Sequence, residues 1–246
     1  MKWGIKKLLR RFGLDIVRHE PDVGCAINLL ELSVPGLLQE STDFHFVQVG
    51  ASDGVRDDPL RRLVLKHGLK GLLVEPLPDA FAALQRNYAD QPQLSFENAA
   101  ISRSPGSMTI HHFREDAPIS DEWHGMATVD GARFLQFAKS IGAETYAEAV
   151  TVPCMTMREL LEKHTLTSVD LLLIDTEGMD FEVLASTLEA GIRPTLIQFE
   201  FIHLPSDVRF QALRLLQNHG YGWVYNGIDV FAALSNVASP VALSAP

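Results

Sequence analysis

A glycine-rich turn after the apolar run FVQV is the most informative chemical feature of this sequence. Gly50 and Gly54 bracket the turn GASDG, and Glu75 ends the next apolar run, GLLVE, about twenty positions later. Glycines let backbone N–H groups approach a ligand closely, and a carboxylate at the tip of the following strand can accept hydrogen bonds from two ribose hydroxyls. These residues predict a site for a nucleoside-containing cofactor.

The same turn argues against a dinucleotide as that cofactor. A dinucleotide-binding turn has the pattern G-x-G-x-x-G, which this turn lacks. Asp53 also places a carboxylate where an anionic pyrophosphate would bind only N–H donors. Ser52 and Asp53 instead offer polar atoms to an amino-acid head group. A ligand with a cationic sulfonium and an ammonium group fits better.

Carboxylates crowd the end of another apolar run, in the segment IDTEGMD. Such carboxylates could position a substrate hydroxyl, hold a hydrated divalent cation or cap the next helix. We interpret Asp175 and Glu177 as catalytic candidates, with Asp175 also beside the cofactor, and Asp180 as a capping or solvated residue. No set of histidines and acids has the spacing of metal ligands, so we predict no metal site.

A histidine follows the apolar segment IQFEF and would emerge at the same rim. An imidazole such as that of His203 could take a proton from an acceptor hydroxyl, so His203 is a candidate catalytic base. The alternative is a hydrogen-bonded structural role. His111, His112 and His124 are weaker candidates for the base.

The elements that must position these residues alternate along the chain. Continuous apolar runs predict strands covered on both faces, at 44–49, 71–76, 94–99, 169–175 and 195–201. Segments with apolar three-to-four spacing predict helices, at 58–68, 78–90, 155–165, 178–191 and 208–220. This alternation predicts an α/β fold with a doubly wound, mostly parallel sheet, in which ligands bind at the carboxyl ends of the strands.

Three segments depart from the repeat. Residues 1–40 predict a helical extension before a domain at 41–246, with Val34, Pro35 and Gly36 marking a turn between two helical pieces. Residues 103–150 predict an insertion over the strand ends, with a helix at 131–143. The segments YGWVYN and DVFAAL flank Gly227 and predict a terminal antiparallel hairpin, the ending of a class I methyltransferase sheet.

The spacing of the first fourteen residues predicts a short helix with an apolar stripe surrounded by lysines and arginines. Such a helix could pack on its own domain or a partner subunit, or rest on an anionic membrane through residues 1–18 with Trp3 near the headgroups. No signal-peptide or membrane-spanning run is present in the sequence, so we expect a cytoplasmic protein, with membrane contact limited to the periphery of the inner face.

Charge and cysteine usage narrow the class further. The 246 residues include 21 Lys and Arg against 31 Asp and Glu, a formal charge of -10, which disfavours nucleic acid as a partner. Cys25 and Cys154 lack zinc-site spacing and are expected to be structural thiols in a reducing compartment.

The chain resembles the FkbM-type family of S-adenosylmethionine-dependent methyltransferases over roughly residues 44–235. The resemblance lies in FVQVGASDGVRDDPL, LVEPLPDAFAAL, ENAAIS and VPCMTMRELLEKHTLTSVDLLLIDTEGMDFEVL. It implies a class I, Rossmann-like fold and S-adenosyl-L-methionine as the cofactor. Ser52 stands where many relatives have Asn, and Gln48 where class I enzymes often have an acid.

The resemblance also implies which residues bind the cofactor. The turn would wrap its methionine part, Glu75 would bind the ribose, and Asn98 with Ala99 would line the adenine. The full set of cofactor residues is Gln48, Gly50, Ala51, Ser52, Asp53, Gly54, Glu75, Pro76, Asn98, Ala99 and Asp175.

Family members are viewed as O-methyltransferases of sugars, glycans and some natural products, and methyl transfer requires no metal. The leading hypothesis is therefore methyl transfer to a hydroxyl of a saccharide, glycan or glycan-like metabolite. The alternatives are a non-catalytic cofactor-binding or scaffold module of a glycan-synthesis complex, and an NAD(P)-dependent oxidoreductase.

Overall fold

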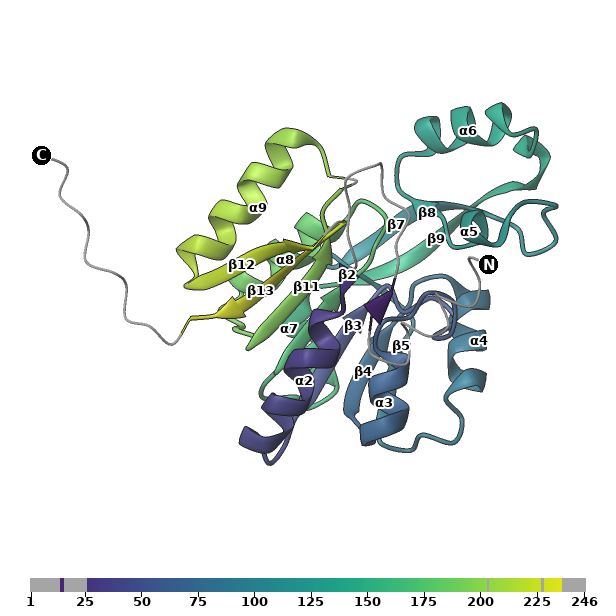
Figure 1. Ribbon diagram of the computed structural model, residues 1–246. Coiled ribbons are helices and arrows are strands. Elements are labelled where there is room, and N and C mark those ends of the chain that lie inside the picture. Colours follow the sequence, from purple (N-terminus) through teal and green to yellow (C-terminus); the bar gives the residue numbers. More distant parts are fainter. Residues whose placement is uncertain (1–13, 16–25, 203, 227, 236–246) are drawn as a thin grey trace, which may run out of the picture.

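The centre of the molecule is a twisted sheet, shown in the computed structural model of Figure 1, which describes residues 14–15, 26–202, 204–226 and 228–235. Within these residues the sheet has seven strands in the order β12-β13-β11-β10-β3-β4-β5. In chain order the strands are β3 (His45–Val49), β4 (Lys70–Val74), β5 (Leu94–Glu97), β10 (Leu171–Ile174), β11 (Leu196–Glu200), β12 (Tyr221–Asn226) and β13 (Asp229–Leu234).

Strand direction defines the fold. β3, β4, β5, β10 and β11 are mutually parallel, and β13 runs antiparallel between β11 and β12. The chain winds from β3 outward to β5 and then returns to β10 on the other side, so the strand order reverses beside β3. Ligands of doubly wound sheets bind at such a reversal. The predicted fold class, its strands and its terminal hairpin are confirmed.

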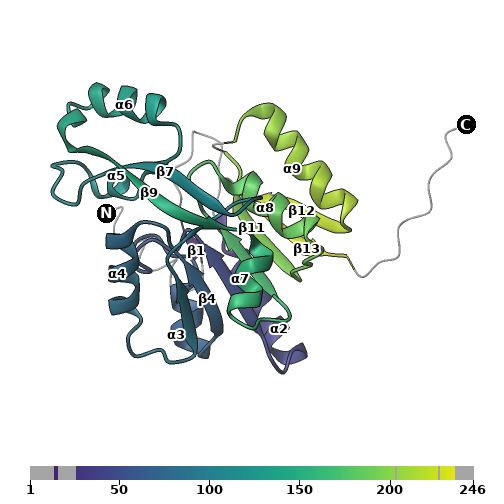
Figure 2. The ribbon, with the colours of Figure 1, turned by 180° about the vertical axis from the view of Figure 1, so that it is seen from behind.

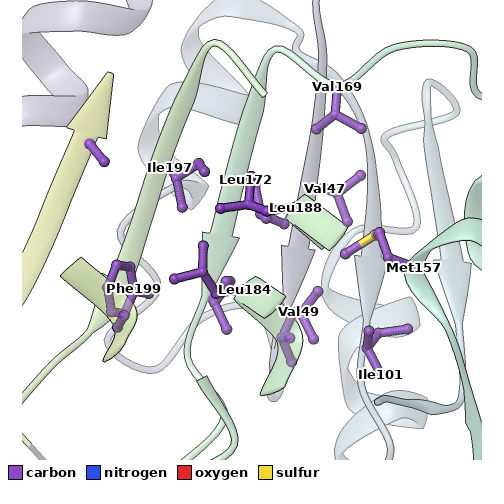
Figure 3. Close-up of a cluster of buried hydrophobic side chains, with 14 of the residues drawn as sticks. Val47, Val49, Ile101, Met157, Val169, Leu172, Leu184, Leu188, Ile197 and Phe199 are labelled. Carbon is purple, nitrogen blue, oxygen red and sulfur yellow. The ribbon is translucent and has the colours of Figure 1, made fainter. Parts of the chain in front are cut away.

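Helices cover both faces of this sheet (Figures 1 and 2). Alternate strand residues face opposite layers: Val47 and Leu172 pack with α7, α8 and α9, and Phe46 and Leu171 pack with α2, α3 and α4. Figure 3 shows the first of these two cores. The helices are α2 (Leu29–Glu40), α3 (Arg61–His67), α4 (Pro78–Asn87), α7 (Met157–Lys163), α8 (Asp180–Glu189) and α9 (Ser206–Asn218).

Local sequence signals set several of these helix ends. Thr156 and Glu159 form a capping box at the start of α7, each side chain accepting a hydrogen bond from the backbone N–H of the other. Gly68 ends α3 in the left-handed region, at φ 62°. The helix predicted at each of the five amphipathic segments is present.

The turn predicted at Val34, Pro35 and Gly36 is wrong, because all three residues lie inside the continuous helix α2. The Asn28 side chain caps this helix by accepting from Glu31 N, and Leu30 and Val34 are fully buried in the core. A proline costs a helix one backbone hydrogen bond, and this burial offsets the loss.

The amino-terminal segment is described in part. Leu14 and Asp15 form the short strand β1, paired antiparallel with β2 (Ala26–Ile27). Most of the predicted basic helix, residues 1–13, and Cys25 lie outside the described residues. No helix of the described ranges is long and apolar enough to cross a membrane.

A second, four-stranded sheet separates β5 from β10, in the order β6-β9-β7-β8. Phe113 of β7 packs with Phe134 and Ala138 of α6 in a small separate core, and the helix predicted at 131–143 is present as α6. This sheet stands over α4 in Figure 1. Its elements are β6 (Ala100–Ile101), β7 (Gly106–Phe113), α5 (Asp121–His124), β8 (Ala127–Thr128), α6 (Gly131–Ser140), a 3-10 helix (Glu144–Tyr146) and β9 (Ala147–Met155).

Candidate active site

The glycine turn directly follows β3 and packs against two neighbouring strand ends. The N–H groups of Gly50 and Ala51 donate to the carbonyl of Val74 at 2.9 and 3.0 Å. Gly50 has φ +84°, and a Cβ there would lie 1.7 Å from the carbonyl oxygen of Asp175. Only glycine therefore allows the end of β3 to touch the backbone that follows β10.

The rest of the turn exposes two polar residues. Ser52 and Asp53 are partly exposed, whereas Ala51 and Gly54 are buried. Asp53 Oδ1 accepts from the N–H groups of Val55 and of the next residue, so one of its oxygens folds the loop. The polar surface that the turn offers to a ligand comes from Ser52 and Asp53.

Glu75, after β4, is 5% exposed and holds the turn in place. Its Oε2 accepts from Ser52 N and its Oε1 from Leu77 N, both at 2.8 Å. Burial raises the pKa of Glu75 to about 7, the two N–H groups oppose that shift, and the nearby charge of Asp53 adds to it. Each carboxylate oxygen retains a second lone pair, which is what a ribose hydroxyl requires.

Asn98 positions the segment that carries Glu75. Its Nδ2 donates to the carbonyls of Glu75 and Pro76, at 2.8 and 3.1 Å. Asn98 and Pro76 are partly exposed, whereas Ala99 has no exposed surface. Asn98 therefore has surface for the predicted adenine contact, whereas Ala99 has none.

Gln48 is a buried residue of β3, just before the glycine turn. It is 2% exposed, and its Nε2 donates to Asp58 Oδ1 at 3.3 Å. Asp58 Oδ2 accepts from the Tyr88 hydroxyl at 2.9 Å, and burial raises the pKa of Asp58. Sequence reasoning missed Asp58, although an acid and a proline just before a helix were a local signal of a structural turn.

The carboxylates after β10 have unequal surroundings. Asp180 is 1% exposed, and its Oδ2 accepts from Thr176 Oγ1 and Gly178 N. Of its two predicted roles, capping or solvation, solvation is therefore wrong, and its hydrogen bonds hold the loop before α8. Glu177 adopts a left-handed conformation, with φ 51°, in the loop that Asp180 holds. Asp175 remains exposed, and partial desolvation together with the charge of Asp180 raises its pKa to about 8.

Two further acids, which sequence reasoning missed, join this group. Glu200 ends β11 and Asp229 begins β13, and the two are directly opposite in the antiparallel register. Gln198 Nε2 donates to Asp229 Oδ2 at 2.8 Å. Their meeting depends on the register of β11 with β13, which no local pattern reveals. Among the described residues no group of three or more His, Cys, Asp or Glu is arranged to hold a metal ion.

The two adjacent histidines of β7 face opposite ways. His111 packs under α6, where a Cβ on Gly131 would lie 2.3 Å from its Nε2 and the Phe134 ring is 6.3 Å away. His112 lines a cavity, with Nδ1 3.0 Å from the carbonyl oxygen of Phe113. A carbonyl oxygen can only accept, so Nδ1 carries the hydrogen and Nε2 is the accepting nitrogen of the neutral ring.

That cavity, of about 850 Å³, lies between the glycine turn, the start of α4 and the second sheet. The side chains of Glu75, Asp175 and Glu177 do not line it, and His203 lies outside the described residues. Because β10 and β4 flank β3, Asp175 and Glu177 lie on the β10 side of the turn, whereas Glu75 and the start of α4, which lines the cavity, lie on the β4 side. Its polar lining comprises Ser52, Asp53, Arg56, Asp79, His112, Arg114, Glu115, Asp116, His124 and Glu148.

The sequence model of the family described as "Methyltransferase FkbM domain" matches residues 48–222, well over half of the chain. The chain belongs to the FkbM methyltransferase family. It is thus an S-adenosylmethionine-dependent methyltransferase, and S-adenosylmethionine is its cofactor. Neither the oxidoreductase nor the non-catalytic alternative is retained. The curated protein sequences contain no significant match.

Solved structures of several methyltransferases are similar to this chain. A precorrin-6y C5,15-methyltransferase from Geobacter metallireducens has 11% identity and a TM-score of 0.43, covering 90% of this chain and 94% of that one. Aeropyrum pernix fibrillarin, solved with bound S-adenosyl-L-methionine, has 12% identity and a TM-score of 0.38, covering 82% and 74%. A putative caffeoyl-CoA O-methyltransferase from Staphylococcus aureus has 11% identity and a TM-score of 0.44, covering 93% and 91%.

Proposed function

We propose that this protein transfers the methyl group of S-adenosylmethionine to a hydroxyl of a saccharide or glycan-like acceptor. The observation that supports this proposal is the cavity beside the glycine turn. Its walls combine carboxylates, guanidinium groups and imidazoles with few large apolar side chains. Sugars are recognised through many hydroxyls that donate and accept at once, which such a mixed lining can satisfy.

The cofactor is proposed to lie across the strand ends on both sides of β3. In this arrangement the methionine part of the cofactor contacts Ser52, Asp53 and Asp175. The Glu75 carboxylate accepts hydrogen bonds from the ribose hydroxyls, and the adenine lies near Asn98. The contact between Gly50 and the Asp175 backbone supports this arrangement, because it joins the turn to the end of β10.

Methyl transfer is an in-line displacement at carbon. The carbon–sulfur bond of the sulfonium breaks while the acceptor oxygen forms its bond to the methyl carbon, and the hydroxyl proton must leave. We assign that proton to Nε2 of His112, the accepting nitrogen of a ring that faces the cavity. Asp175 and Glu177, on the other side of the turn, are proposed to hold the cofactor and its loop.

The test is methyl transfer from radiolabelled S-adenosylmethionine to extracted glycans and glycolipids. We expect label in an O-methylated sugar after acid hydrolysis of the accepting fraction. Label found only on nitrogen or carbon would contradict the proposal. A folded sample that binds S-adenosylhomocysteine but labels no saccharide fraction would also contradict it.

We further propose that residues 1–18 bring the enzyme to an anionic membrane surface. The support is their sequence, in which Lys2, Lys6, Lys7, Arg10 and Arg11 surround an apolar stripe. The full chain should float with vesicles containing anionic lipid, and a variant without residues 1–18 should not. Equal flotation of the two proteins would disprove this contact.

A further inference from the structure

The strand β12 forms one edge of the seven-stranded sheet (Figure 1). Among the described residues its neighbour is β13, and no strand lies beyond it. The four residues from Gly222 to Tyr225 are all exposed, so side chains on both faces of the strand reach solvent. Trp223, Val224 and Tyr225 are 43, 52 and 53% exposed. Exposed apolar surface on an edge strand indicates a site of association.

The pairing of β12 with β13 determines which backbone groups of β12 face outward. Ser235 N donates to Gly220 O, and these two residues are opposite each other in the extended register of the pair. Hydrogen-bonded residues alternate along an antiparallel strand, so the even-numbered residues of β12 bond to β13. The N–H and C=O groups of Tyr221, Trp223 and Tyr225 therefore point away from β13, in the direction from which a further strand would bind.

The two edges of the sheet differ in how they are protected. Natural edge strands are commonly short, or carry charged residues or prolines, which oppose pairing with another chain. At the opposite edge, β5 has four residues, and its charged residue Glu97 binds Lys163 and His164. By contrast, β12 has six residues, YGWVYN, without a charge or a proline. The sequence of β12 thus leaves this edge open to pairing.

The strand is complementary to itself in one antiparallel register. A two-fold axis through Trp223 places Trp223 opposite its own copy and Tyr221 opposite Tyr225, so that all three outward-facing residues find a partner. Each pair of this kind exchanges two backbone hydrogen bonds. The same register sets Val224 opposite Gly222, where a Cβ would meet nothing within 4 Å. A glycine inside a strand suits the close approach of another backbone.

We propose that β12 pairs antiparallel with β12 of a second copy of this chain, joining the two sheets into one. A second copy fits because the outward-facing groups match themselves about the axis, and the strand has no charge that the axis would set against itself. Aromatic contacts across the axis add to this pairing, with the Tyr225 ring held against Phe201 at 5.9 Å. The interface depends on neither the cofactor position nor the methyl acceptor.

Sedimentation equilibrium of the full chain tests the interface. We expect the parent to reach twice the mass of one chain at micromolar concentration. Trp223→Lys sets two lysines opposite each other at the axis and should raise the dissociation constant at least about 30-fold. Leu135→Lys is the matched control, because Leu135 is 42% exposed on α6, and it should dimerise like the parent. A monomeric parent, or equal dimerisation of the two variants, would overturn the proposal.

Amide hydrogen exchange of the parent decides the proposal if Trp223→Lys fails to fold. On dilution from dimer to monomer, the N–H groups of Tyr221, Trp223 and Tyr225 should lose protection, whereas that of Val224 should stay protected by β13. Protection of the three outward-facing groups that does not change with protein concentration would overturn the proposal, because another segment of the same chain would then cover β12. Absence of protection at every concentration would overturn it as well.

Cysteine pairs test the register. Gly222 and Val224 would face each other across the axis in a non-hydrogen-bonded pair, with Cα atoms about 4.5 Å apart, which a disulfide can span. In a Cys25→Ser background, a mixture of Gly222→Cys and Val224→Cys proteins should form a disulfide-linked dimer under mild oxidation, and neither protein should do so alone. Linking of Val224→Cys alone would overturn this register, and no linking in the mixture would overturn the pairing of β12 with its copy.

Discussion

The two walls of the cavity are built by different means. The wall on the glycine turn is fixed by backbone N–H donors: those of Ser52 and Leu77 bind the Glu75 carboxylate, and that of Gly50 binds the Val74 carbonyl. The wall on the second sheet presents side chains such as Glu148 of β9 and Arg114, which follows β7, and this sheet has a small core of its own. The first wall suits one constant ligand, and the second can change its side chains without disturbing the first.

Gly50→Ala should displace the glycine turn from the backbone that follows β10, which disrupts the first wall. The added methyl would lie 1.7 Å from the Asp175 carbonyl oxygen, at a φ of +84° that strains any L side chain. We expect loss of S-adenosylhomocysteine binding in titration and a lower melting temperature. Gly125→Ala is the control, because a Cβ there meets nothing within 4 Å. Binding retained in Gly50→Ala would show that the turn can move away from β10.

His112→Gln probes the chemistry assigned to the second wall. We expect kcat to fall by at least about 100-fold on the glycan fraction that accepts label, while S-adenosylhomocysteine binding is unchanged. His67→Gln, an exposed histidine of α3, serves as the control. A normal kcat would exclude His112 as the base.

Glu75→Gln should weaken the cofactor without touching the acceptor wall. The amide presents an NH₂ to one of the two backbone N–H groups that now donate to the carboxylate. We expect S-adenosylhomocysteine affinity to fall roughly 30-fold, about 2 kcal/mol. Glu97→Gln is the control, since Glu97 binds Lys163 and His164 instead of the turn. Equal losses in the two variants would indicate a general loss of stability.

Arg114→Gln should have the smallest effect on stability and cofactor binding. Arg114 pairs with the exposed Asp116 and stacks on the Tyr146 ring at the surface of the second sheet. We expect the melting temperature to stay within about 1 °C and S-adenosylhomocysteine affinity to be unchanged, while KM for the acceptor rises. A large loss of cofactor affinity would show that the two walls are coupled.

The difference between the walls also explains what the sequence could predict. The strand ends, Gly50 and Glu75 follow from local patterns, because apolar runs and a glycine turn carry their own signals. The directions in which His111 and His112 point do not follow from local patterns. Adjacent strand residues point to opposite faces, and only the pairing with β9 and the packing of α6 decide which histidine faces the cavity. The turn predicted at Pro35 was wrong for a related reason, because buried tertiary contacts override a local helix-breaking signal.

The carboxylates show the same limit. Asp175 and Glu177 were found from their place after an apolar run, whereas Glu200 and Asp229 meet only through the pairing of β11 with β13. The burial of Asp180 depends on the fold around α8, which spacing does not encode.

The position of β13 has a consequence for how this protein is made. β13 follows β12 in the chain but lies between β11 and β12 in the sheet. During synthesis, β11 therefore exposes an unpaired edge until Asp229–Leu234 has left the ribosome. Unpaired edges invite pairing with other chains. A nascent protein stalled before Asp229 would thus be a prime substrate for chaperones, although the glycine turn and Glu75 have already been synthesised at that point.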